Sequence, residues 1–405
     1  MTNTRAFVIL ADESAAWKIA GLRQLDRLVL AINEFCNSSA AESQLDIIVF
    51  WKPETPLSER WLPPSKGVIR LFDNNQRQLD FGARILSTRL LVGRAVLSEF
   101  MAEVRNVEAV ARTSDERRLW TETWHDFEVA CQSASARQKV SPAWRYLNAF
   151  DEIPPSERAF LRRVGKPQDG IVSRFINRPI SRTITRFLLR YRITPAAWTI
   201  SMLVLPVAAF FILLRGDYFA FVAGVTIFQI YSVVDGCDGE IARAKYLESE
   251  KGGRLDTWTD IFGGFIFIFG LGYGLYRKHS AAANAWHYVV QAIACVLLIA
   301  INEWRLRGGR SERNVPVDAL VPTLYPRHQE LIQHSGILLL GEKLVWWLVQ
   351  LTKRDISIFL FFLLAAASRP EWILPLWIAA TAAVLVLAEI ARWKRAHSSL
   401  RDRPR

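Results

Sequence analysis

Four aspartates at the ends of two apolar runs are the residues of this sequence best placed to do chemistry. Asp235 and Asp238 close one run, and Asp256 and Asp260 open the next. Spacings of three and four put each pair on one face of a helix. An ionised Asp at the centre of a bilayer costs at least about 2.5 kcal/mol, so such residues are functional by default. The alternative, acidic caps at helix ends, explains this density of carboxylates poorly.

Converging carboxylates repel one another unless cations neutralise them. Oxygen ligands without His or Cys select Mg²⁺, Mn²⁺ or Ca²⁺. Two such ions can clamp a pyrophosphate, stabilise a departing phosphate and orient an attacking oxygen. Small residues at Gly236, Gly239, Ala242, Gly252 and Gly253 leave room for a nucleotide to approach the backbone. The sequence therefore predicts a site for divalent metal, Mg²⁺ or Mn²⁺, with two ions expected.

The whole pattern reads Asp235-xx-Asp238-Gly239-xx-Ala242-Arg243, eight residues, then Gly252-xxx-Asp256-xxx-Asp260. It resembles the signature of the CDP-alcohol phosphatidyltransferase family at every fixed position. The resemblance implies a metal-dependent transferase with six membrane helices, which moves a phospho-alcohol group from a CDP-alcohol to a hydroxyl acceptor and releases CMP. It also implies a homodimer.

The resemblance assigns roles to individual residues. It implies metal binding by the four aspartates, and proton removal from the acceptor hydroxyl by Asp260 as general base. The nucleotide contacts that it implies are Thr199, Asp238, Gly239, Ala242, Arg243 and Gly252. Where the family has a Pro-Asn-x-x-Thr element, this chain has Pro195-Ala196-Ala197-Trp198-Thr199, without the Asn.

Five basic residues are candidates for binding the phosphate of an acceptor such as inositol phosphate or glycerol phosphate. They are Arg182, Arg186, Lys251, Arg254 and Arg354. Binding to lipid headgroups is the alternative for the same residues. The sequence leaves open whether the donor is CDP-diacylglycerol or a soluble CDP-alcohol.

The elements that must position these residues lie in the apolar carboxy-terminal half. Apolar runs predict six membrane helices, at 197–214, 218–235, 256–276, 286–302, 354–368 and 372–391. The fifth run is short; it begins earlier, within Leu344–Gln350, or it is tilted. Lys and Arg are concentrated in alternate loops, so both termini and the site are expected on the cytoplasmic side of the inner membrane. We expect no secretory signal peptide.

The net charge of +12 requires an anionic partner, either nucleic acid or the inner membrane surface. The arginine-rich segment from Arg158 to Arg192 runs into the first apolar span, which favours membrane lipids over nucleic acid. Bulky apolar residues such as Phe175, Ile184 and Phe187 alternate with its arginines. The pattern predicts an amphipathic helix in the membrane interface, with a solvated linker helix as the alternative.

The amino-terminal half alternates short strands, at Phe7–Leu10, Asp46–Phe50, Val68–Leu71 and Leu90–Val92, with helical patterns such as Leu22–Phe35. This order predicts an α/β, Rossmann-like fold and resembles the cytidylyltransferase fused to some family members, including those that make di-inositol phosphates. The loop after the first strand has no glycine and carries two acids, Asp12 and Glu13. Such a loop lacks the backbone cradle for a triphosphate, so we expect a degenerate domain.

The expected domains are 1–145 (degenerate nucleotidyltransferase-like), 146–195 (basic juxtamembrane helix), 196–395 (membrane transferase) and 396–405 (basic tail). Two other hypotheses remain. One is a bifunctional enzyme that also makes its CDP-alcohol, such as CDP-inositol, from CTP. The other is a non-enzymatic membrane scaffold, which the aspartate pattern disfavours.

Overall fold

The computed structural model describes residues 6–38, 45–64, 69–74, 76, 83–93, 96–104, 115–137, 144–163, 169–307, 337, 341–351 and 353–401. The chain divides into two compact units. The first unit contains residues 1–164, 186–192 and 240–247, and the second contains 165–185, 193–239 and 248–405. The domain boundaries expected from the sequence stay a prediction.

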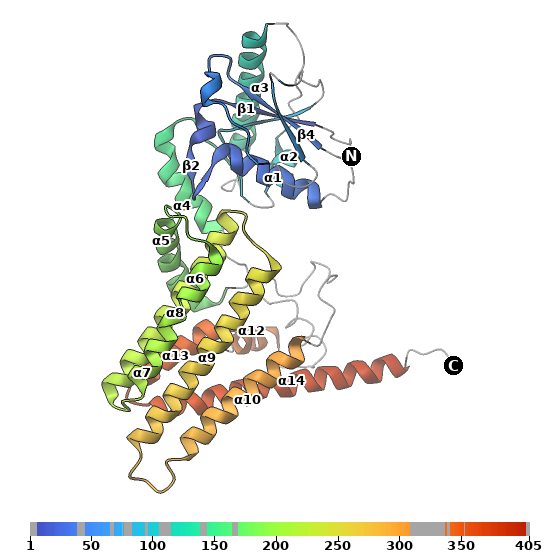
Figure 1. The fold of residues 1–405 in the computed structure, drawn as a ribbon. Coiled ribbons are helices and arrows are strands. Elements are labelled where there is room, and N and C mark those ends of the chain that lie inside the picture. The colour runs from blue at the N-terminus through green and yellow to red at the C-terminus, as the bar shows by residue number, and fades with distance from the viewer. Residues whose placement is uncertain are drawn as a thin grey trace. The chain divides into compact units, whose positions relative to one another are not determined.

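The first unit is built on a parallel sheet with the strand order β5-β4-β1-β6 (Figure 1). Its strands are β1 (Ala6–Ala11), β4 (Leu45–Trp51), β5 (Ile69–Asp73) and β6 (Arg84–Ser87). Every residue of β1 and β4 is buried, as expected for the central strands of a parallel sheet covered on both faces. The α/β fold predicted for this half of the chain is therefore confirmed.

The described part of the first unit also contains four helices and two small antiparallel strand pairs. The helices are α1 (Gln24–Ser38), α2 (Leu97–Glu103), α3 (Glu116–Arg137) and α4 (Ile153–Arg163). One antiparallel pair is a hairpin of β2 (Lys18–Ile19) with β3 (Leu22–Arg23), and the other joins β7 (Leu90–Leu91) to β8 (Arg145–Tyr146), which is distant in the sequence. Short 3₁₀ turns lie at Glu13–Ala16, Leu57–Glu59 and Phe150–Glu152.

The sequence analysis missed one strand of this sheet, and one strand that it did predict lies outside the sheet. The run expected as a strand at Leu90–Val92 is β7, which pairs antiparallel with β8 instead of joining the parallel sheet. The strand that does pair with β1 on that side is β6, which the sequence analysis missed. Only four residues long and beginning with Arg84, β6 carries too short an apolar run to be recognised.

The second unit is helical. A π-helical turn at Ser173–Asn177 leads into α5 (Arg178–Leu188), whose residues from Arg186 onward belong to the first unit. The remaining helices are α6 (Pro195–Ser201), α7 (Val204–Leu213), α8 (Tyr218–Ala244), α9 (Glu250–Lys278), α10 (His287–Arg307), α12 (Glu342–Leu351), α13 (Arg354–Ala366) and α14 (Ile373–Arg401), with a 3₁₀ turn at Pro370–Trp372. Helix α9 packs against α6, α7 and α10, and α10 packs against α14 (Figure 1).

Five helical segments of the described residues are long and apolar enough to cross a membrane. They are Pro195–Leu213, Tyr218–Ala244, Glu250–Lys278, His287–Arg305 and Pro370–Trp393. The expected count of six is not confirmed, because the run at 354–368 forms α13, a helix of 13 residues. At 1.5 Å per residue α13 is about 20 Å long, against a hydrocarbon core of about 30 Å. The protein is nevertheless a multi-pass membrane protein.

The C-terminal end of α8 is held within the first unit by a buried arginine. Arg27 is 0% exposed and donates hydrogen bonds to the carbonyls of Ile19 and of Ala244, the last residue of α8. Its guanidinium also lies 4.6 Å from the centroid of the Phe160 ring. Burial lowers the pKa of Arg27 to about 10, so the side chain stays charged at neutral pH. A cation here is favourable, because carbonyl dipoles point out of a helix C-terminus.

Candidate active site

The aspartates lie on two helices that follow one another in the chain. Asp235 and Asp238 are on α8, and Asp256 and Asp260 are on α9. Helix α9 begins at a defined point, because the Ser249 hydroxyl accepts a hydrogen bond from the Gly252 N–H at 3.0 Å. Ser is a preferred N-cap residue for this reason. The cap fixes the distance along α9 from its first turn to both aspartates.

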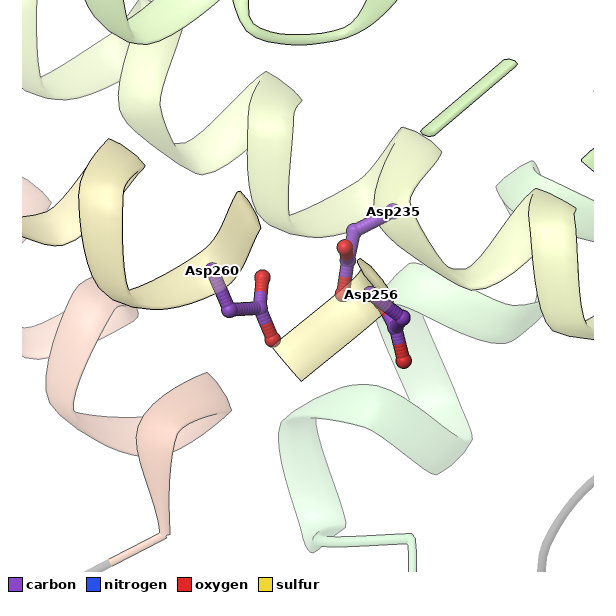
Figure 2. A group of neighbouring side chains, drawn as sticks. All are labelled: Asp235, Asp256 and Asp260. Atoms are coloured by element: carbon purple, nitrogen blue, oxygen red, sulfur yellow. The ribbon is translucent and has the colours of Figure 1, made fainter. Parts of the chain in front are cut away.

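Three of the four predicted carboxylates come together. One oxygen each of Asp235, Asp256 and Asp260 lies within 4.8 Å of the other two (Figure 2). All three residues are partly buried, and all three donors are hard oxygens of the kind that Mg²⁺ and Mn²⁺ prefer. The residues present therefore fit a divalent cation site of the predicted chemistry.

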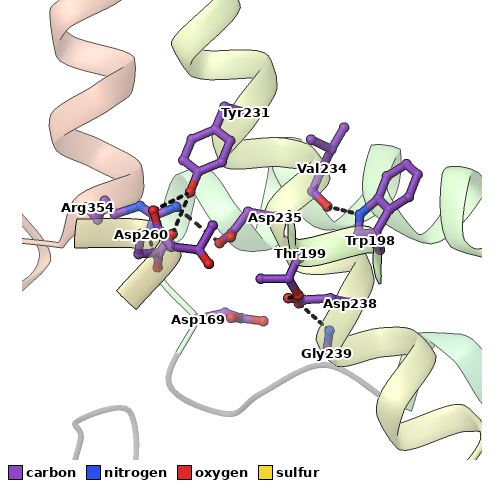
Figure 3. Close-up of polar contacts among 12 residues, drawn as sticks. Asp169, Trp198, Thr199, Tyr231, Val234, Asp235, Asp238, Gly239, Asp260 and Arg354 are labelled. Atoms are coloured by element: carbon purple, nitrogen blue, oxygen red, sulfur yellow. Dashed lines mark hydrogen bonds and ion pairs between the residues drawn. The ribbon is translucent and has the colours of Figure 1, made fainter. Parts of the chain in front are cut away.

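Asp238 lies outside this group and contacts the first apolar segment instead. The Thr199 hydroxyl donates a hydrogen bond of 2.5 Å to Asp238 Oδ2, and the Gly239 N–H donates to Oδ1 of the same carboxylate (Figure 3). Both Thr199 and Asp238 are almost fully buried. The Trp198 indole N–H, one residue before Thr199, donates to the Val234 carbonyl at 3.0 Å. These contacts join α6 to α8 at the residues expected to bind the nucleotide.

A guanidinium from α13 reaches the carboxylate group. Arg354 Nη2 lies 3.1 Å from Asp235 Oδ2, and Arg354 Nη1 contacts Asp260 Oδ2 (Figure 3). The sequence analysis had named Arg354 only as a candidate for the acceptor phosphate. The structure places its charge between two of the predicted metal ligands. It does so although 119 residues separate Arg354 from Asp235 in the chain.

The other acceptor-phosphate candidates lie elsewhere. Lys251 and Arg254 are exposed in the first turns of α9, and Arg182 is partly buried on α5. Arg186 belongs to the first unit, where its Nε lies 3.0 Å from Glu157 Oε2. Among the contacts that the structure describes, Arg354 is the candidate that reaches the aspartates.

The remaining signature residues occupy the helix ends. Gly252 is the residue whose N–H is bound by the α9 cap. Ala242 is buried and Arg243 is partly buried in the last turn of α8, in the segment 240–247 that belongs to the first unit. Their contacts with a nucleotide stay a prediction.

Tyr231 is a site residue that the sequence analysis missed. Its hydroxyl donates a hydrogen bond of 3.1 Å to Asp260 Oδ1 (Figure 3). The available signal was its position four residues before Asp235, which puts both side chains on one face of α8.

The sheet of the first unit has a topological switch point at the carboxyl ends of β1 and β6. The chain passes from β1 to β4 on one side and returns to β6 on the other, and α/β folds bind ligands at such a switch point. Here Asp12, directly after β1, receives two hydrogen bonds from Arg89, at 3.1 and 2.8 Å. The Arg89 guanidinium also lies within 6 Å of the ring centroids of Trp17 and Trp124. An internal ion pair between two rings thus fills this position.

Comparison with known proteins places the site in a family. Residues 192–352 match the CDP-alcohol phosphatidyltransferase family. Proteins named bifunctional IPC transferase and DIPP synthase are similar to the chain. The one from Archaeoglobus fulgidus is 35% identical over 127 residues, which are 31% of this chain and 25% of the relative. The one from Rubrobacter xylanophilus is 32% identical over 199 residues, 49% of this chain and 42% of the relative.

A third relative of the same name, from Thermococcus kodakarensis, is 26% identical over 241 residues, 57% of this chain and 53% of the relative. The chain thus spans about a quarter to a half of the length of these relatives. The family match covers α6 to α10 and α12, and it includes all four aspartates of the spaced pattern. The segment that matches the CDP-alcohol phosphatidyltransferase family is therefore the segment that holds the four aspartates of the candidate site.

Proposed function

We propose that this chain transfers a phospho-alcohol group from a CDP-alcohol to a hydroxyl acceptor and releases CMP. The observation that carries the proposal is the convergence of Asp235, Asp256 and Asp260 within the segment that matches this family. Mg²⁺ or Mn²⁺ held by these carboxylates would supply positive charge to the diphosphate. Two ions are proposed, with Asp238 as the fourth carboxylate of the set.

The reaction forms one bond and breaks another. The acceptor oxygen attacks the β-phosphorus of the CDP-alcohol, and the bond from that phosphorus to the CMP oxygen breaks. The acceptor proton passes to Asp260, which is the general base in this proposal. CMP leaves with the electron pair of the broken bond, on the phosphate oxygen that had bridged the two phosphorus atoms.

The nucleotide is proposed to bind on the side of Thr199, Asp238 and Gly239. The hydrogen bond from Thr199 to Asp238 supports this assignment, because it fixes a carboxylate that then faces the first apolar segment. Ala242, Arg243 and Gly252 complete the proposed nucleotide contacts. Arg354 is proposed to bind the acceptor phosphate, since its charge lies beside the base Asp260.

The substrates are proposed from the relatives and from chemistry. The DIPP synthase part of the relatives' name supports inositol phosphate as the acceptor and a soluble CDP-alcohol as the donor. CDP-diacylglycerol with inositol phosphate or glycerol phosphate is the competing pair. We further propose a homodimer in the inner membrane, with both termini and the site on the cytoplasmic side.

The relatives are named as bifunctional proteins, and the second candidate function of this chain is an additional synthesis of the CDP-alcohol from CTP. The ion pair between Asp12 and Arg89 argues against it in this chain, because these side chains fill the switch point where a triphosphate would bind. For this reason a bifunctional enzyme is only the second candidate function. Release of pyrophosphate from CTP and inositol phosphate would establish it.

One assay tests the proposed function. The purified full-length chain is incubated with a panel of CDP-alcohols and acceptors, with Mg²⁺ or with EDTA, and CMP is measured. We expect CMP release that needs both an acceptor and the divalent cation. Asp256→Asn should abolish release while the melting temperature stays near that of the wild type, since the volume is kept and the charge is lost. Full activity of this variant with Mg²⁺ would disprove the metal assignment.

A further inference from the structure

Tyr231 contacts the carboxylate that the proposed function uses as a base, yet it is not part of the aspartate signature. It lies on α8 and is 1% exposed. Its single hydroxyl proton has two nearby acceptors, Asp260 Oδ1 at 3.1 Å and the Thr259 carbonyl at 3.4 Å. The carboxylate is closer and charged, so it is the stronger acceptor.

The phenol ring is held in place by packing. Tyr231 stacks on Phe228 with ring centroids 5.7 Å apart, and Phe228 stacks on Phe267 at 4.0 Å. Phe228, Tyr231 and Phe267 are all almost fully buried. Neighbouring rings on both α8 and α9 therefore restrict where the hydroxyl can point.

Helix α9 has a glycine where the hydroxyl approaches it. A Cβ added to Gly263 would lie 3.1 Å from the Tyr231 hydroxyl oxygen and 3.2 Å from the ring carbon that bears it. Such contacts are tighter than ordinary van der Waals distance, so a larger residue would push the phenol away. Gly263, three residues after Asp260, thus leaves the space that the Tyr231 hydroxyl needs.

The two oxygens of Asp260 have different partners. Oδ1 accepts from Tyr231, and Oδ2 contacts Arg354, whose guanidinium lies 5.7 Å from the centroid of the Tyr231 ring (Figure 3). A carboxylate bound at each oxygen cannot rotate about its χ2 torsion without losing a contact. The Tyr231 hydroxyl therefore sets the plane of the Asp260 carboxylate.

We propose that Tyr231 is a positioning residue, which orients Asp260 for removal of the acceptor proton. This inference rests on the proposed function. It predicts a specific kinetic signature, because the Tyr231 hydroxyl bonds to the Asp260 side chain and the Thr259 carbonyl, and not to Thr199 or Asp238 among the described residues. Loss of the hydroxyl should lower the rate of transfer in the bound complex, while the affinity for the donor is preserved.

The test compares Tyr231→Phe with Tyr288→Phe. The first variant keeps the buried ring and removes only the hydroxyl. Tyr288 is a buried tyrosine of the same helical unit, on α10, whose ring packs against His279 and His287. Each variant is measured by CMP release, for kcat and donor KM, and by the rise in melting temperature that CDP and Mg²⁺ produce.

We expect Tyr231→Phe to lower kcat about tenfold, as for loss of a hydrogen bond to a charged group. Its donor KM should stay within about twofold of the wild type, as should the CDP concentration that gives half of the thermal shift. Tyr288→Phe should keep the wild-type kcat. Gly263→Ala should lower kcat in the wild-type background and have a smaller effect in Tyr231→Phe, where the added methyl group still meets the ring but no hydroxyl is left to displace.

A Tyr231→Phe variant with wild-type kcat would overturn the inference. So would an equal effect of Gly263→Ala in both backgrounds, or a loss of CDP binding that accounts for the whole defect. If the wild type itself releases no CMP with any donor, the proposed function fails. That result differs from an active wild type whose Tyr231→Phe variant is unimpaired, which overturns the inference alone.

Discussion

Variants of Asp260 and Asp235 can separate the proposed role of general base from the proposed role of metal ligand. Arg354 contacts both carboxylates, Asp235 at 3.1 Å through Nη2 and Asp260 through Nη1. Replacing either aspartate by Asn keeps the side-chain volume, removes one negative charge and weakens one contact with the same guanidinium. These losses match, and the hydrogen bond from Tyr231 to Asp260 is the contact that differs. A difference in kinetic behaviour between the two variants that exceeds the effect of Tyr231→Phe therefore reports a difference in chemical role.

The expected magnitudes follow from these roles. Loss of a general base lowers the rate by at least about 100-fold, or about 2.7 kcal/mol in activation free energy. Asp260→Asn should show this loss in the single-turnover rate of bound CDP-alcohol and should still bind the donor. Asp235→Asn should instead weaken Mg²⁺ and donor binding together, because its carboxylate is assigned to the cation alone.

The assay is a single-turnover measurement of CMP formation at saturating donor, combined with equilibrium donor binding at several Mg²⁺ concentrations. One result would refute the reasoning. If Asp260→Asn loses donor binding as severely as Asp235→Asn, while the rate of the bound complex is unchanged, Asp260 is a metal ligand only. Another group or a water molecule would then accept the proton.

Three further predictions follow from the packing. Gly236→Ala should destabilise the protein by about 1–3 kcal/mol, because a Cβ there would lie 2.6 Å from Nη1 of the buried Arg178. Thermal melts measure the effect, with Gly253→Ala as the control, because a Cβ at Gly253 meets nothing within 4 Å. Arg89→Met should lower the free energy of unfolding by about 3 kcal/mol, since it leaves the buried Asp12 carboxylate without its counter-charge. An unchanged melting temperature would contradict this. Deletion of residues 1 to about 150 should leave residual CMP release, since every signature residue lies later in the chain. A folded but inactive truncation would show that the amino-terminal half is essential.

The sequence predicted the parts of the site that depend on local spacing. Each aspartate pair is set by the pitch of one helix, and a cap at Ser249 fixes where the second helix begins. Helical period and charge led to the prediction that all four carboxylates converge, and three of them, Asp235, Asp256 and Asp260, come together. Thr199 and Asp238, which the family resemblance names separately as nucleotide contacts, hydrogen-bond to each other, and their binding of a nucleotide stays a prediction.

The rest depended on tertiary packing that has no local signal. Arg354 meets the aspartates through the fold of α13 against the bundle, and nothing in its flanking sequence distinguishes it from the other arginines. The sequence also left the start of the fifth apolar run open, and the structure begins α13 at Arg354, after the separate helix α12. In the first unit, the pairing of β6 with β1 depends on long-range parallel contacts that four residues cannot encode.

Helix α8 explains how one element serves two parts of the proposed reaction. Tyr231, Asp235 and Asp238 are spaced by four and three residues, so they lie in a row on one face. The first two contact the group around Asp260 and Arg354, and the third contacts Thr199. Three residues rise about 4.5 Å along the axis, so the covalent pitch of the helix sets the offset between the two groups. One residue inserted between Asp235 and Asp238 would rotate one carboxylate by about 100° relative to the other, and no side-chain rotamer could restore both contacts.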